Sequence, residues 1–144
     1  MSTSSKKGFG FYMLLCSAAL ALAAGIYFLV IHGTFGLRNT HNGACYDPLI
    51  TWSLIGGALI TCGLVVLKRY GLASAAGAAA PLIALCVFIH KCYWYVTDVF
   101  VGIDEPKLEF DPRFIIFSVL LALALVVAEV AIYTRKVKDA QGGN

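Results

Sequence analysis

Residues 86–100 read CVFIHKCYWYVTDVF, and within them an apolar segment becomes polar and aromatic. His90 and Lys91 come first, the aromatic run YWY follows at 93–95, and Asp98 comes three residues later. Aromatic residues and lysines gather where a membrane helix reaches the headgroup layer. The stretch therefore predicts one end of a helix that crosses a bilayer.

The composition is that of a chain built for lipid. Of its 144 residues, 60% are hydrophobic and only 13% are charged, and the mean hydropathy is +0.82. A soluble domain usually carries about a quarter charged residues. The length fits one membrane domain, residues 1–144. The lipid bilayer is its expected partner, together with another membrane protein or further copies of the chain. The net charge of +3 is small and lies mostly at the ends of apolar segments, so no nucleic-acid partner is expected.

Four apolar segments are expected to form membrane-spanning helices, at about 9–31, 49–67, 72–97 and 112–134. The first is charge-free from residue 8 to 31, which is enough to cross a ~30 Å hydrocarbon core at ~1.5 Å per residue. A cleaved signal peptide is the rival interpretation, because two lysines precede the segment and ALA at 21–23 resembles a cleavage site. The apolar run, however, continues well beyond the usual length of such a signal.

The second and fourth segments both begin with Asp-Pro, at 47–48 and 111–112. Asp suits the N-cap of a helix, and Pro suits the first helical position because its missing N–H would be unpaired there. The expected fold class is all-α, an integral membrane four-helix bundle made of two transmembrane hairpins.

The basic residues predict the orientation. With both termini on one side, that side holds seven Lys and Arg and the other side holds four. Cytoplasmic segments are enriched in these residues, so both termini are expected in the cytoplasm and the protein in the plasma membrane. The seven are Lys6, Lys7, Lys68, Arg69, Arg135, Lys136 and Lys138, and the four are Arg38, Lys91, Lys107 and Arg113.

Small residues four apart predict where the helices meet, because membrane helices associate through close packing rather than hydrophobicity. Such stripes are Ser17-Ala21-Gly25 in the first segment and Ser53-Gly57-Thr61 in the second, and the third is rich in Ala and Gly. The first three helices are therefore expected to approach closely, and the fourth to show more side chain to lipid. The same stripes also suit a seam between copies of a homo-oligomer.

The polar end of the third segment is the candidate site. By helical spacing, Lys91, Tyr95 and Asp98 share one face, where Lys91 can approach Asp98. Cys86, His90, Tyr93 and Thr97 share another. A plain aromatic belt at the membrane surface, with Lys91 extending to the headgroups, is the simpler explanation of these residues and stays open. The candidate rim for a ligand or partner consists of Arg38, His41, His90, Lys91, Tyr95 and Asp98.

The remaining chemistry is sparse. His32, His41 and His90 lie toward the rim, but their spacing matches no metal motif, so no metal or other cofactor is expected. Cys45 and Cys92 are the pair that can form a disulfide outside the membrane. No ionisable residue is expected near the middle of the bilayer, where a coupled transporter holds its ions. No catalytic motif is present, and the chain is not expected to be an enzyme.

The opening KKGFGFYMLLCSAALALAAGIYFLV, residues 6–30, resembles small four-span membrane proteins of unassigned function in Gram-positive bacteria. The resemblance implies a bacterial plasma membrane and transfers no site residues. The chain lacks the first-helix glutamate of small multidrug-resistance exporters and the paired loop cysteines of claudins and tetraspanins.

Three functions remain open. The first is a non-enzymatic accessory or interaction subunit that presents the rim to another membrane protein. The second is a small-molecule or ion transporter or channel that works as an oligomer of this chain. The third is an outer-face metal or haem redox protein.

Overall fold

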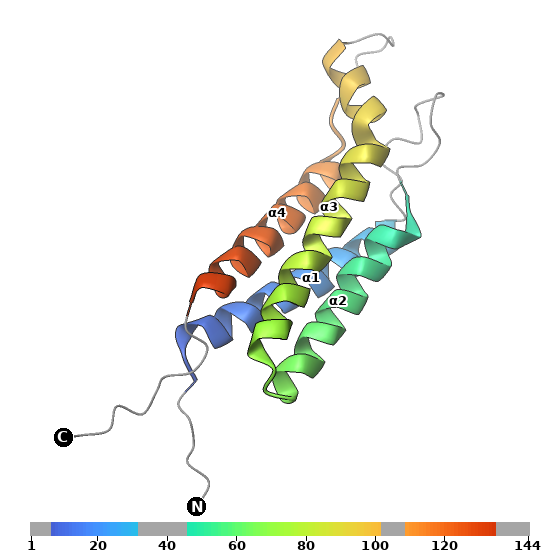
Figure 1. The fold of residues 1–144 in the computed structure, drawn as a ribbon. Helices are drawn as coiled ribbons and strands as arrows, with labels where there is room; N and C mark the ends of the chain where they lie inside the picture. Colours follow the sequence, from blue (N-terminus) through green and yellow to red (C-terminus); the bar gives the residue numbers. More distant parts are fainter. Residues whose placement is uncertain (1–6, 32–45, 102–108, 135–144) are drawn as a thin grey trace, which may run out of the picture.

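The computed structural model describes residues 7–31, 46–101 and 109–134. They form four helices, and each helix runs antiparallel to the one before it, as Figure 1 shows. The helices are α1 (Phe9–Ile31), α2 (Pro48–Val66), α3 (Tyr70–Val101) and α4 (Pro112–Tyr133). All four are long and apolar enough to cross a membrane. The described part of the chain is therefore all-helical, and it has the architecture of a multi-pass membrane protein.

The Asp-Pro pairs start α2 and α4 as the sequence predicts. The carboxylate of Asp47 accepts a hydrogen bond from the backbone N–H of Leu49, at 2.8 Å. Asp111 accepts one from the N–H of Arg113, also at 2.8 Å. Each carboxylate thus satisfies a backbone donor that the first helical turn leaves unpaired.

A tight turn joins α2 to α3. The N–H of Arg69 donates to the carbonyl of Leu64 at 2.9 Å and that of Lys68 to Val65 at 3.0 Å, the pattern of a Schellman motif. Lys68 has a φ of 56°, a left-handed conformation that costs a non-glycine residue roughly 1–2 kcal/mol. The motif reverses the chain within three residues, so α3 begins at Tyr70 rather than at the expected residue 72.

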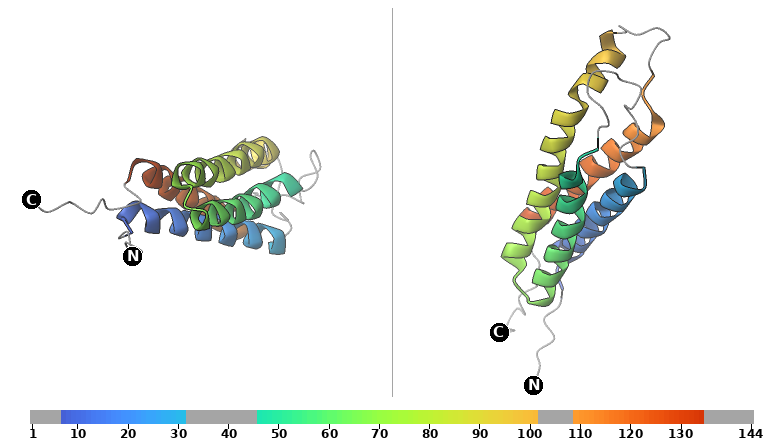
Figure 2. Two further views of the ribbon diagram at one scale, coloured as in Figure 1. Left: turned by 60° about the horizontal axis from the view of Figure 1, so that its bottom comes forward. Right: turned by 90° about the vertical axis from the view of Figure 1, so that its right-hand side faces the viewer.

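The helix α3 is longer than expected at both ends, because it also continues to Val101 instead of ending near 97. Its 32 residues extend about 48 Å, well beyond a hydrocarbon core of ~30 Å. Pro81 lies inside it without ending it. Figures 1 and 2 show that the last turns of α3 continue past the ends of the neighbouring helices.

The packing of the helices differs in part from the sequence expectation. The two most extensive contacts join α2 to α3 and α1 to α4, whereas α1 and α3 touch little and the described helices α2 and α4 do not touch. The expected close approach of α1, α2 and α3 therefore holds for α1 with α2 and for α2 with α3, but not for α1 with α3. At one end of the α1–α4 contact, a methyl group on Gly10 would lie 2.6 Å from the backbone oxygen of Thr134. Of the four spans, α4 is nevertheless the least buried.

Glycines mark two of the crossings. A Cβ on Gly25 of α1 would lie 2.8 Å from the Cγ1 of Ile55 in α2, too close for a real side chain. A Cβ on Gly57 of α2 would collide with the Cβ of Ala80 in α3. Both glycines belong to the small-residue stripes, so at these two positions the stripes serve packing within one chain.

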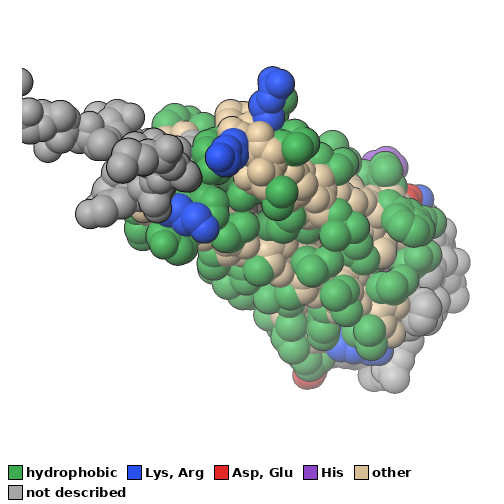
Figure 3. Space-filling model, turned by 90° about the horizontal axis from the view of Figure 1, so that it is seen from below, with side chains coloured by type: hydrophobic (Ala, Val, Ile, Leu, Met, Phe, Trp, Pro, Cys, Tyr) green, Lys and Arg blue, Asp and Glu red, His purple; other side chains and the backbone are tan. Residues whose placement is uncertain are grey.

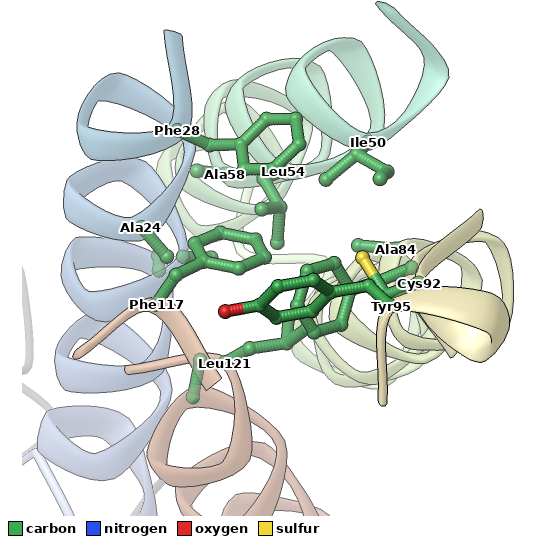
Figure 4. Close-up of a cluster of buried hydrophobic side chains, with 14 residues drawn as sticks. Ala24, Phe28, Ile50, Leu54, Ala58, Ala84, Cys92, Tyr95, Phe117 and Leu121 are labelled. Carbon is green, nitrogen blue, oxygen red and sulfur yellow. The ribbon is translucent and has the colours of Figure 1, made fainter. Parts of the chain in front are cut away.

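Large aromatic side chains fill the half of the bundle near the end of α3. Figure 4 shows Phe28 of α1 and Phe117 of α4 packed against Leu54 of α2, with Tyr95 of α3 beside them. The ring centroids of Phe28 and Phe117 lie 4.6 Å apart. A smaller cluster fills the opposite half, where Leu14 is fully buried.

Candidate functional site

An ion pair joins α2 to α3 where the aromatic end of α3 begins. The Nζ of Lys91 lies 3.4 Å from the Oδ2 of Asp47, and the two side chains are 43% and 23% exposed. From Asp47 to Leu67, α2 and its caps cover about 30 Å, the thickness of a hydrocarbon core. Lys91 lies about 32 Å along α3 from Tyr70. The ion pair therefore lies about one hydrocarbon-core thickness from the turn between α2 and α3.

The partner of Lys91 corrects a sequence expectation. Lys91 pairs with Asp47, although helical spacing placed it near Asp98. A helical side chain leans toward the N-terminus of its helix, and Asp98 lies about 10 Å further in the opposite direction. The ammonium group therefore reaches down to the start of α2.

Tyr95 ties α3 to the start of α4. Its side chain is only 5% exposed, and its hydroxyl accepts a hydrogen bond from the backbone N–H of Asp111 at 2.8 Å. The carboxylate of Asp111 in turn accepts from the Nε of Arg113 at 3.0 Å. Asp98 is also buried, one turn further along α3. Two residues of the candidate rim, Tyr95 and Asp98, thus face the interior of the bundle.

The opposite face of α3 is open. Cys86, His90 and Tyr93 are exposed there, and the neighbouring Trp94 packs edge-to-face against Tyr93 with ring centroids 5.5 Å apart. The two faces that the sequence left as alternatives are now distinguished. The face with Tyr95 and Asp98 is internal, and the face with His90 and Tyr93 is external.

A continuous group of aromatic rings lies behind the site, and the sequence reasoning missed it. Phe110 stacks on Phe114 at 5.7 Å between centroids, Phe114 on Phe88 at 5.4 Å, and Phe88 packs edge-to-face on Phe117 at 4.9 Å. Phe100 lies next to Val101, the last residue or tip of α3, and joins the group through Phe110, with 5.6 Å between the two ring centroids. The spacing of 110, 114 and 117, typical of one helix face, was the available signal.

Several predicted site residues cannot be placed. Arg38, His41 and Cys45 lie outside the described residues, as does His32. Cys92, the proposed disulfide partner of Cys45, is buried. Among the residues that the structure describes, no group of three His, Cys, Asp or Glu is placed to hold a metal ion.

The charged residues of the four helices lie near their ends. Lys91 and Asp98 occupy the last third of α3, Arg113 the first turn of α4, and Glu129 the exposed surface of α4 about 26 Å from its start. The hydroxyls of Thr51 and Thr61 are buried, and neither has a hydrogen-bond partner. Thr51 lies in the first turn of α2 and Thr61 in its last third, and the middle of each described helix carries no charged residue.

No protein-family model, curated protein or solved structure matches the chain. Its four candidate spanning helices indicate a multi-pass membrane protein.

Proposed function

We propose that this chain is a non-enzymatic subunit of a membrane assembly, and that it binds a partner protein through the exposed end of α3. One observation carries the proposal. Beyond the ion pair at Lys91, α3 continues for ten residues, about 15 Å, and this extension carries exposed aromatic side chains. The exposed fractions are 59% for Tyr93, 51% for Trp94 and 77% for Phe100.

An aromatic belt accounts for only part of this surface. Tyr93 and Trp94 lie within one turn of Lys91, at the depth where such rings meet lipid headgroups. Phe100 lies about 14 Å beyond Lys91 along the helix axis. Leaving a phenylalanine in water forgoes about 1.5–3 kcal/mol of transfer free energy. Aromatic side chains of this kind are enriched in the parts of protein interfaces that contribute most to binding.

The interior supports a binding role rather than transport by one copy. Aromatic rings fill the half of the bundle near the rim, and the charged residues of the helices lie near their ends. A coupled transporter needs ionisable groups near the midplane.

The orientation belongs to the same proposal. The exposed cations Lys7, Lys68 and Arg69 lie at the end of the bundle opposite the tip of α3, and Figure 3 shows Lys and Arg side chains on this otherwise largely hydrophobic end. The positive-inside rule favours the cytoplasm for that end. We therefore place both termini in the cytoplasm of a bacterial cell and the tip of α3 outside.

A second candidate function is an oligomeric conduit made of several copies of the chain. Gly56 and Gly63 support it, because no atom lies within 4 Å of a Cβ built on either. They are seven residues apart on α2, a spacing that suits a left-handed crossing with another helix.

The test is the mass of the full-length protein, purified from its native membrane in mild detergent, with every co-purifying chain identified. The proposal expects a stoichiometric partner that is lost in the double variant Trp94→Ala and Phe100→Ala. The control is Tyr12→Ala, which removes an aromatic ring from the other end of the bundle, and the exposure of that ring, 59%, is intermediate between those of Trp94 and Phe100. A partner retained by the double variant would refute the role of the α3 tip, and a homo-oligomer without partners would favour the conduit.

A further inference from the structure

Pro81 lies inside α3, and its side chain is fully buried in the bundle. Counted from Tyr70, it lies about 17 Å along the helix, roughly half the thickness of a hydrocarbon core. Proline has no backbone N–H, so the carbonyl of Gly77 lacks the donor that a regular helix provides four residues later. Lipid cannot replace that donor. The helix α3 therefore contains, near the middle of the membrane, an acceptor without its regular partner.

A hydroxyl group of the neighbouring helix packs on Gly77. Thr61 of α2 is fully buried, and its hydroxyl has no hydrogen-bond partner. A Cβ built on Gly77 would lie 3.5 Å from the Oγ1 of Thr61 and 3.5 Å from its Cγ2. The serines of the described helices differ, because each donates its hydroxyl to a carbonyl of its own preceding turn. These serines are Ser17, Ser53, Ser74 and Ser118. The hydroxyl of Thr61 is thus a buried, unpaired donor beside the acceptor that Pro81 leaves.

The directions of the two groups also suit a hydrogen bond. Because α2 and α3 are antiparallel, one turn later in α2 corresponds to one turn earlier in α3 (Figure 1). The carbonyl of Gly77 points toward the C-terminus of α3, which is the direction of the N-terminus of α2. A helical side chain leans toward the N-terminus of its own helix, so Thr61 leans in the same direction. Its hydroxyl therefore lies on the side of Gly77 toward which the carbonyl points.

A bend at Pro81 would move this carbonyl toward the hydroxyl. The ring of a proline inside a helix collides with the carbonyl four residues before it, and bending the helix away from the ring relieves the collision. Because the ring of Pro81 faces the interior, the outer half of α3 would bend away from the bundle. The carbonyl of Gly77 would then tilt out of its helix toward Thr61, which could donate to it.

The outer half of α3 is a long lever that few polar contacts hold in place. From Pro81 to the tip it extends about 30 Å, so a further bend of about 20° would move the tip by about 10 Å. On the α2 side it is held by the ion pair of Lys91, between partly exposed groups that stabilise a fold little. On the α4 side Tyr95 accepts its hydrogen bond from the N–H of Asp111. A buried hydrogen bond at Thr61 would offset the loss of these contacts.

We propose that α3 is hinged at Pro81, and that a hydrogen bond from the hydroxyl of Thr61 to the carbonyl of Gly77 stabilises its more bent state. The described conformation is the less bent state, held by the contacts of Lys91 and Tyr95. The hinge is a property of the chain alone and does not depend on a partner at the tip of α3. A partner that binds only one position of the tip would shift the balance between the two states.

The first experiment is fluorine NMR of the full-length protein in lipid nanodiscs, labelled with 5-fluorotryptophan. The chain has two tryptophans, Trp52 in the first turns of α2 and Trp94 in the outer half of α3. The signal of Trp94 should show relaxation dispersion from exchange on the microsecond-to-millisecond timescale of helix movements. Trp52 is the internal reference and should show none. No exchange at Trp94, or equal exchange at both tryptophans, would overturn the proposal.

Three variants test the roles of the two residues. Thr61→Val removes the donor, and Pro81→Ala restores the backbone N–H that pairs with the carbonyl of Gly77, so each should lower the exchange contribution at Trp94 at least fivefold. The control Thr51→Val removes the other buried, unpaired hydroxyl of α2 and should leave the exchange unchanged. Undiminished exchange in Thr61→Val, or an equal loss in the control, would overturn the role of Thr61.

The displacement is measured separately, by pulsed electron paramagnetic resonance between two gadolinium tags. The tags are coupled to p-azidophenylalanine at Phe100 and at Val30, both exposed, so the native cysteines stay in place. Val30 lies on α1, which touches α3 little, so a bend of α3 away from the bundle lengthens this distance. The wild type should show a second distance about 10 Å longer than the first, and Thr61→Val should lose it. A single distance in the wild type would refute the hinge.

Discussion

The crossing of α2 and α3 at Gly57 can be tested by adding a single methyl group. A Cβ at residue 57 would lie closer to the Cβ of Ala80 than two carbon atoms can approach. Each Cβ is bonded directly to a helix backbone, so neither atom can move away without shifting its helix. Overpacking of this kind typically costs about 1–3 kcal/mol. Replacing glycine with alanine inside a helix otherwise gains roughly 0.5–1 kcal/mol. We therefore expect Gly57→Ala to lower the free energy of unfolding by about 1–2 kcal/mol.

Two controls separate the steric clash from the intrinsic effect of alanine. Gly63 lies on the same helix with open space around its Cβ, so Gly63→Ala should leave stability unchanged or raise it slightly. Ala80→Gly removes the methyl group that Gly57→Ala would meet. The double variant Gly57→Ala with Ala80→Gly should therefore be more stable than the sum of the two single changes, by about 1 kcal/mol or more.

The assay is reversible unfolding in mixed micelles of a mild detergent and sodium dodecyl sulfate, followed by circular dichroism. Strictly additive effects of the two substitutions would show that residues 57 and 80 do not touch. A Gly57→Ala variant as stable as the wild type would refute the close crossing itself.

Two further predictions concern polar groups inside the bundle. Thr61→Val replaces a buried hydroxyl that has no hydrogen-bond partner with a methyl group of the same shape, so it should raise the free energy of unfolding by about 1 kcal/mol in the same micelles. The control is Ser74→Val, which removes the hydrogen bond from the Ser74 hydroxyl to the carbonyl of Tyr70 and should lower the free energy of unfolding. Tyr95→Phe removes the acceptor for the backbone N–H of Asp111 and should cost about 0.5–1.5 kcal/mol, with faster hydrogen exchange confined to the start of α4. Unchanged exchange there would show that the contact between α3 and α4 does not depend on this hydrogen bond.

Hydropathy was enough to predict the four helices, because each has to satisfy its backbone hydrogen bonds within itself before it can cross a bilayer. The starts of α2 and α4 were predictable for a similar reason. The cap of Asp47 on Leu49 involves two residues that are close in sequence, so no knowledge of the fold is required. The early start of α3 was not predicted, because it depends on Lys68 adopting a conformation that lysine rarely adopts.

The candidate site was predicted in its place along the chain but not in its arrangement. Helical spacing shows which residues share a face, yet it leaves the rotation of the helix about its own axis undetermined. That rotation decided that Tyr95 faces the interior and Tyr93 the outside. It also gave Lys91 a partner on α2, more than forty residues away in the sequence.

The amino-acid sequence by itself thus determined the number of helices, their apolar character and the position of the aromatic end of α3. Hydropathy and capping act over a few neighbouring residues, so they do not depend on the tertiary fold. The tertiary structure alone decided that α4 packs along α1 and that Phe28, Phe88 and Phe117 meet in one cluster. These features depend on how side chains from different helices fill the space between them. In lipid, where every apolar face can be solvated equally well, close packing rather than hydrophobicity selects the arrangement.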